Sequence, residues 1–379
     1  MAVYKLFPSA DTFIFTEAVS ANAGLDELIE IGGYEIQGYG QTTRGIVQFN
    51  NNEIQNVVNN KITSASFPYS ASLELKLCTA YETPKSHSVF VYPISGAWSA
   101  GIGKYADTLG RTLTTGSVDQ SGVSWRYRQP EKQEPWTLSS FTAEVTASYN
   151  SNYPGGGNWY TSSFGIDLEA TQSFNTSDNL DLNVNVTPAV KLHYSGTLPN
   201  YGFIIKLQDS EEFAMSSSLR HKYYSNDTNT IYPPSLTFKW DDSSYETGSL
   251  SLLTSSKAIV NITNNRGEYQ DIGKVRFRLL ARPSNPVRVY TTGSIYKTNY
   301  ALPSASYYAI QDNYTEELEI PFDSGSTKIS CDATGPFFDV YMHGLQPERF
   351  YKILIKSELD GTTTVFDSDN IFKVVRNGW

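Results

Sequence analysis

The sequence predicts an all-β protein built of two β-sandwiches, and three observations carry this prediction. Apolar and polar residues alternate with a period of two in many short runs, which is typical of antiparallel strands with one buried face. Tyr and Phe favour pleated surfaces, and the chain of 379 residues holds 26 Tyr and 19 Phe. Charged residues make up 18% of the chain, below the average of about 25%.

The alternation is clear along the whole chain. The run "ASLELKLC" (71–78) places Leu73, Leu75 and Leu77 on one face of a strand. Comparable runs are "DNLDLNVNVT" (178–187), "EELEIPF" (316–322) and "RFYKILIKS" (349–357). The stretch "LPNYGFIIKL" (198–207) follows a Pro-Asn turn and is apolar enough for a central strand.

Few segments have helical spacing. The first is 51–60, and the second is 187–195, with Thr187 as the expected N-cap and Pro188 at the first helical position. Residues 24–33 are interpreted as a loop that enters a strand. The polar, Ser-rich stretch 239–249 suggests a boundary between a first domain, 1–240, and a second domain, 250–379.

Composition excludes several classes of partner. The net charge is −10 and no basic stripe occurs, so we expect no nucleic-acid partner. No apolar run has the length of a membrane span, so we expect no membrane partner. Cys78 and Cys331 are far apart and are expected to be buried thiols. The N-terminus lacks a signal-peptide pattern, so folding in the cytosol is expected; a mature fragment of a secreted protein remains the alternative.

No catalytic motif is present, and we predict that the chain is not an enzyme. The four His residues lie at no metal-binding spacing, and no nucleophile elbow, P-loop or dinucleotide fingerprint occurs. Asp167 and Glu169 lie two residues apart, but such pairs are common on acidic surfaces. No cofactor is expected except calcium, for which Asp11, Asp178 and Asp181 are weak candidates beside the alternative of turn-forming residues.

Aromatic residues give the strongest indication of binding. Trp98, Trp125, Trp159 and Tyr160 cluster in the loop-rich middle of the first domain. Exposed aromatic rings in a groove hold the apolar faces of sugars. The alternative is that these rings fill the ends of the sandwich or pack against neighbouring subunits.

The first 240 residues resemble the DNRLRE-type domain, a jelly-roll sandwich related to carbohydrate-binding modules. The phrases that carry the resemblance occur in this order: "ADTFI" (10–14), "NAGLDELIEIGG" (22–33), "TRGIVQFN" (43–50), "LDLNVNVTPAVKLHYSG" (180–196), "PNYGFIIKL" (199–207) and "PPSLTFKW" (233–240). The resemblance implies a jelly-roll β-sandwich for the first domain.

The second domain carries "GLQPERFYKILIK" (344–356), which resembles a strand segment of a smaller immunoglobulin- or fibronectin-like β-sandwich. There the Tyr351 hydroxyl is expected to form a corner hydrogen bond to the backbone.

The two folds together resemble virion proteins of tailed bacteriophages. The expected function is a structural component of the tail, neck, baseplate or capsid surface, made in the host cytoplasm and located in the virion. Its expected partners are other virion proteins and symmetric copies of itself. The alternative is a glycan-binding module or adhesin that contacts a host-surface polysaccharide.

Overall fold

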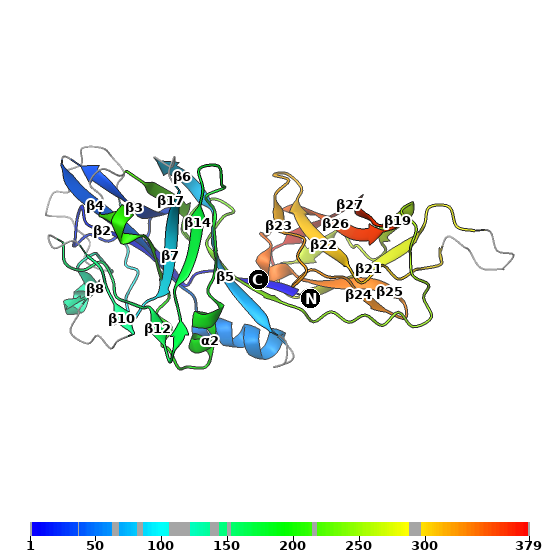
Figure 1. Cartoon of the computed structure of the whole chain (residues 1–379), viewed down its shortest axis with the longest axis horizontal. Helices are drawn as coiled ribbons and strands as arrows, with labels where there is room; N and C mark the ends of the chain where they lie inside the picture. Colours follow the sequence, from blue (N-terminus) through cyan, green and yellow to red (C-terminus); the bar gives the residue numbers. More distant parts are fainter. Residues whose placement is uncertain are drawn as a thin grey trace. The chain divides into compact units, whose positions relative to one another are not determined.

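The chain is all-β, as predicted, and forms two compact units in a computed structural model (Figure 1). The larger unit comprises Leu6–Lys61 and Ser70–Thr237. The smaller unit comprises Met1–Lys5, Ile62–Tyr69 and Phe238–Trp379. The structure describes residues 2–36, 38–62, 68–81, 86–105, 122–136, 144–149, 153–213, 218–287 and 297–377.

An eight-stranded antiparallel sheet forms the frame of the larger unit. Strand β16 (Phe203–Leu207) lies between β7 (His87–Pro93) and β4 (Tyr39–Gln48), and all of its residues are buried. This confirms the prediction of a central strand at the end of "LPNYGFIIKL". The remaining strands of the sheet are β14 (Ala170–Phe174) beside β7, then β3 (Leu28–Ile36), β17 (Arg220–Tyr224) and β6 (Leu77–Tyr81) beyond β4, and β2 (Ala10–Phe15), which also pairs with β4.

A second sheet contains β5 (Tyr69–Leu75) and β15 (Leu182–Asn185), which pair antiparallel. Their apolar residues alternate with exposed or half-buried ones, as the period of two predicted. The prediction is wrong for Leu77, because the chain leaves β5 at Lys76 and Leu77 starts β6 in the other sheet. Cys78 on β6 is exposed, contrary to the expected buried thiol, whereas Cys331 is buried.

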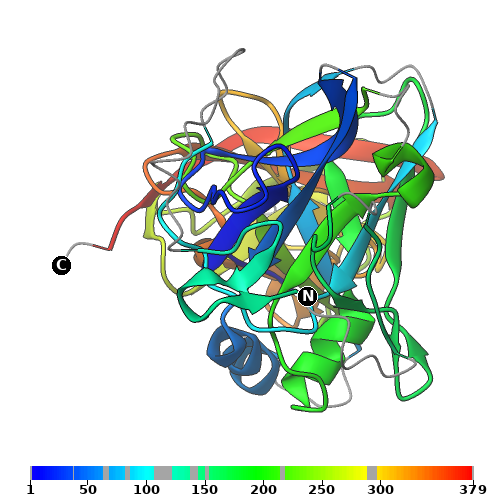
Figure 2. The same ribbon diagram turned by 90° about the vertical axis from the view of Figure 1, so that its left-hand side faces the viewer.

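Two short helices lie side by side in the larger unit (Figures 1 and 2). They are α1 (Asn51–Asn56), continued by one π-helical turn at Val57–Lys61, and α2 (Thr187–Tyr194). The Tyr194 hydroxyl donates to Asn59 Oδ1 at 2.8 Å across them. Both helices agree with the sequence prediction.

Thr187 does not cap α2 as predicted. The N-cap residue is Val186, and Thr187 lies in the first helical turn before Pro188. The Thr187 hydroxyl accepts the backbone N–H of Ala71 in β5 at 2.8 Å. It therefore joins the helix to the sheet and is not available to the first turn of the helix.

Short elements between β7 and β14 cover one face of the eight-stranded sheet. A further short helix, α3 (Asp209–Glu212), follows β16 directly. The short strands are β8 (Tyr127–Gln129), β9 (Glu134–Pro135), β10 (Val145–Thr146), β11 (Trp159–Tyr160), β12 (Ser162–Ser163) and β13 (Ile166–Asp167), with a 3₁₀ turn at Pro130–Lys132.

The smaller unit is a sandwich of two sheets around an aromatic core. The Tyr308 and Phe338 rings stack across the core with centroids 4.3 Å apart. One sheet contains β19 (Ala258–Ile262), β21 (Lys274–Pro283), β25 (Gly335–Tyr341) and β24 (Ser330–Asp332); the other contains β20 (Glu268–Gln270), β27 (Thr362–Val375), β26 (Phe350–Leu359), β22 (Ser306–Asp312) and β23 (Leu318–Ile320). Further elements among the described residues are β1 (Ala2–Leu6), β18 (Ser235–Trp240) and a 3₁₀ turn at Met342–Gly344.

None of the helices in the described ranges combines the length and the apolar composition that crossing a membrane requires.

The predicted corner bond is present in the smaller unit. The Tyr351 ring is buried, and its hydroxyl donates to the backbone oxygen of Gln346 at 3.1 Å. Burial raises the pKa of the Tyr351 hydroxyl above its usual value, so the group is a neutral donor. This bond holds the turn that leads into β26.

Substitution Tyr351→Phe tests the corner bond. It leaves a backbone acceptor without its partner, and we expect the free energy of unfolding of the smaller unit to fall by about 1–2 kcal/mol. Urea denaturation of the full chain measures this change. The matched control is Tyr314→Phe, because the Tyr314 ring is exposed. Equal stability of the two variants would contradict the role of the corner bond.

Candidate functional site

Arg44 of β4 is a cation whose side chain is fully shielded from solvent. Its guanidinium lies between the rings of Trp125 and Trp159, at 5.1 Å and 5.2 Å from their centroids. Cations are attracted to the faces of aromatic rings, and most strongly where water is excluded. The two indoles therefore enclose the charge as well as fill space.

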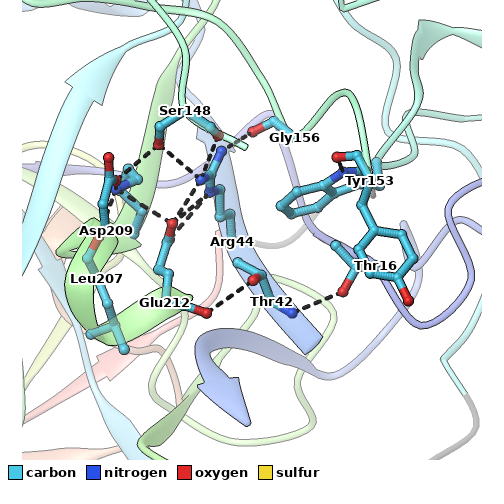
Figure 3. Close-up of polar contacts among 11 residues, drawn as sticks. Thr16, Thr42, Arg44, Ser148, Tyr153, Gly156, Leu207, Asp209 and Glu212 are labelled. Atoms are coloured by element: carbon cyan, nitrogen blue, oxygen red, sulfur yellow. Dashed lines mark hydrogen bonds and ion pairs between the residues drawn. The ribbon is translucent and has the colours of Figure 1, made fainter. Parts of the chain in front are cut away.

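Glu212 at the end of α3 neutralises this cation. Its carboxylate accepts from Arg44 Nη2 at 2.7 Å and from Arg44 Nε at 3.2 Å (Figure 3). The Glu212 side chain is also fully buried. A buried ion pair is tolerated when further hydrogen bonds satisfy both groups, and Arg44 has additional acceptors in two loops.

The first of these acceptors comes from the glycine turn in "YPGGGNW". Gly156 O accepts from Arg44 Nη1 at 2.7 Å. Gly156 has φ +82°, and a Cβ atom there would lie 2.6 Å from the Trp125 ring. Only glycine fits at this position, because the backbone must approach both the cation and the indole closely.

The second acceptor lies in the loop after β10. Arg44 Nη2 donates to the Ser148 backbone oxygen at 2.9 Å, and the Ser148 hydroxyl donates to Asp209 Oδ1, also at 2.9 Å (Figure 3). Asp209 Oδ1 accepts in addition from Lys206 Nζ at 2.6 Å. The network thus runs from the buried pair to an exposed carboxylate at the start of α3.

A cavity of about 370 Å³ opens beside this network on the covered face of the sheet. One side is aromatic. The Phe90 and Tyr92 rings of β7 stack with their centroids 6.2 Å apart, and the Tyr92 and Trp159 rings stack with their centroids 5.7 Å apart. The remaining residues that line it are Thr146, Ala147, Ser148, Thr161, Lys206, Gln208, Asp209 and Ser210. The cavity combines an apolar platform with hydrogen-bonding groups.

The aromatic and polar sides of the cavity carry groups with different protonation states. Burial alone would raise the pKa of Asp209, but the hydrogen bond and positive charge of Lys206 outweigh it, and the pKa lies below its usual value. Burial and the acceptor Glu169, at 2.7 Å, raise the pKa of the Tyr92 hydroxyl. At neutral pH the cavity therefore offers an ionised carboxylate and a neutral phenol.

The aromatic residues named by the sequence lie largely inside the unit. Trp98 and Trp125 are buried, and their indole N–H groups donate to the backbone oxygens of Tyr201 and Tyr153. Neither ring presents a face to solvent, which agrees with the alternative that such rings fill the interior of the unit. Trp159 is also buried but lines the cavity, whereas half-buried Tyr160 does not line it.

The three calcium candidates have protein partners. Asp178 Oδ2 accepts a backbone N–H three residues earlier, and Asp181 Oδ2 pairs with Lys76 Nζ at 2.9 Å. Asp11 is buried, accepts the Asn226 backbone N–H, and has its pKa raised to about 7, first by burial. In the ranges that the structure describes, no three His, Cys, Asp or Glu residues gather as a metal site.

The acid pair considered from sequence forms a local turn. Asp167 Oδ1 accepts the Glu169 backbone N–H at 3.0 Å. Three of the four His residues are buried, and the rings of His87 and His221 meet edge to face at 4.8 Å. Burial lowers the pKa of His221 to about 3 and that of His193 to about 4, so both are neutral core groups.

The central residues of the site were missed from sequence. Neither Arg44 nor Glu212 is among the candidate site residues that the sequence indicates. The available signal was Lys206, a cation within the apolar strand "FIIKL", which predicts a buried partner. Its partner Asp209 follows three residues later, but Arg44 lies far away in sequence.

Comparisons with known proteins add no family. No family model matches the chain, and no curated protein matches it. Among solved structures, the chain is similar to a DUF4785 family protein from Legionella pneumophila, with 8% identity and a TM-score of 0.18. That alignment covers 98% of this chain and 66% of the other one. At this TM-score the similarity supports no conclusion about fold or function.

Substitution Glu212→Gln tests the buried pair. The amide removes the charge that compensates Arg44, and we expect the larger unit to lose about 3–5 kcal/mol of stability. Urea denaturation followed by tryptophan fluorescence measures the loss. The control is Glu131→Gln, which changes an exposed carboxylate of the same unit. A Glu212 variant as stable as this control would show that the pair is dispensable.

Proposed function

We propose that the chain is a saccharide-binding protein without catalytic activity, which holds its ligand in the cavity of the larger unit. The observation that carries the proposal is the pairing of an aromatic wall, Phe90 and Tyr92, with the polar groups of Gln208, Asp209 and Ser210 around one cavity.

Sugars need both kinds of wall. The C–H face of a sugar ring is apolar and packs on aromatic rings, while its hydroxyl groups need fixed acceptors and donors. The half-buried Phe90 ring is the accessible end of the aromatic row, and Gln208, Asp209 and Ser210 are exposed. The buried network behind them holds Asp209 through Lys206 and Ser148, so the polar wall is preorganised.

A second candidate is a structural component of a tailed-phage particle, and the hairpin β12–β13 favours it. Phe164 at its tip is 75% exposed and has φ +50°, a conformation that bulky residues rarely adopt. Ile166 on the same hairpin is exposed as well. An apolar tip held in water suits contact with another virion protein or a second copy of the chain. The candidates are compatible, because a phage adhesin performs both roles.

Substitution Phe90→Ala tests saccharide binding. Loss of the accessible ring removes stacking area, and we expect glycan affinity to fall at least tenfold, which corresponds to about 1.4 kcal/mol. A glycan array followed by calorimetry on the best ligands measures this change. Phe164→Ala is the control, because Phe164 does not line the cavity. If the wild-type chain binds no saccharide, the proposed function is wrong.

Substitution Phe164→Ser tests the second candidate. We expect the wild-type chain to self-associate or join particles through the hairpin, and the polar residue to weaken this association about tenfold, because it removes the apolar contact. Analytical ultracentrifugation over a concentration series measures it. Saccharide affinity should stay unchanged. A wild-type chain that is monomeric at every concentration and absent from particles would contradict the second candidate.

A further inference from the structure

Two protein carboxylates, those of Asp209 and Glu212, already compensate the charge of Lys206. Lys206 is the one cation among the described residues that line the cavity. Lys206 Nζ donates to Leu207 O at 2.7 Å and to Asp209 Oδ1 at 2.6 Å, and it forms an ion pair with Glu212 Oε2 at 3.4 Å. The ammonium is also buried. An anionic ligand would therefore find no free cation on the cavity wall.

Asp209 keeps one carboxylate oxygen open. Both of its protein donors, Lys206 and Ser148, bond to Oδ1, and no described residue donates to Oδ2. The side chain is 55% exposed. The positive charge of Lys206 outweighs burial and keeps the pKa of Asp209 low, so Oδ2 is an ionised acceptor at neutral pH. This oxygen is suited to accept ligand hydroxyl groups.

Further negative charge lies beside the aromatic wall. Glu169 accepts the Tyr92 hydroxyl at 2.7 Å, and Asp167 is bonded to the Glu169 backbone. Burial is the largest cause of the raised pKa of the Tyr92 hydroxyl, and the negative charges of Glu169, Asp209 and Asp167 raise it further. A carboxylate therefore contacts the polar end of the aromatic wall.

We propose that the cavity binds a neutral sugar ring through its hydroxyl groups and rejects sugars that carry carboxylate or sulfate groups; this inference rests on the proposed saccharide binding. A neutral ring packs on Phe90 and donates to the open oxygen of Asp209. An anionic ring meets carboxylates and no unpaired cation. Small-molecule sites span about 300–1,000 Å³. The volume of about 370 Å³ is at the low end, so the cavity fits a short terminal unit of a glycan.

The test compares sugars that differ only in oxidation at C6. Calorimetry on the full chain uses oligosaccharides of glucose, galactose and mannose and, at equal length, oligosaccharides of the corresponding uronic acids. We expect the best neutral ligand to bind at least tenfold more tightly than its uronate. Because salt screens repulsion, the affinity for the uronate should rise with ionic strength.

Two variants locate the effect. Glu169→Gln leaves the Lys206 network intact. It should raise the affinity for the uronate, leave the affinity for the neutral sugar unchanged, and so reduce the difference between the two affinities. Asp209→Asn should lower the affinity for the neutral ligand about tenfold. Thermal unfolding checks that the variant keeps its fold. A uronate that binds the wild type as tightly as its neutral partner overturns the selectivity but leaves the proposed function standing. Absence of binding by every sugar overturns the proposed function itself.

Discussion

The buried ion pair between Arg44 and Glu212 is the constraint on which the larger unit depends. The two residues are 168 positions apart in the sequence, yet their side chains meet where both are fully shielded from water. A guanidinium in such a place is costly unless every donor finds an acceptor. The strand β4, the helix α3, the loop at Ser148 and the turn at Gly156 must therefore all be correctly placed at once.

The same ion pair also fixes the position of the polar side chains that line the cavity. Glu212 lies at the end of the one-turn helix that Asp209 begins, and Lys206 contacts both carboxylates. A displacement of the helix would break contacts at the buried end and move the exposed carboxylate at the other end. Stability and the proposed ligand recognition therefore share one network, and the cavity obtains its polar groups on a segment of only four residues.

The sequence allowed good prediction of strands and poor prediction of the site. Strand β16 and the alternating strand β26 follow from local periodicity, and the Tyr351 corner bond follows from a local motif. Leu77 was misplaced because a run of alternating residues does not reveal where a chain changes sheet. The partners of Arg44 come from segments distant in sequence, and no local pattern encodes such contacts.

The tryptophans show why the sequence indicated the aromatic-rich region of the larger unit but did not predict what each ring contacts. A large ring is useful both to a ligand and to a buried charge, and sequence does not separate the two uses. Here Trp125 and Trp159 each direct a ring face toward Arg44. Of the three aromatic residues that line the cavity, Phe90 is half-buried while Tyr92 and Trp159 are buried, so Phe90 is the ring most accessible to the proposed ligand. In an aromatic cluster built around a cation, only the rings that remain accessible are available to the proposed ligand.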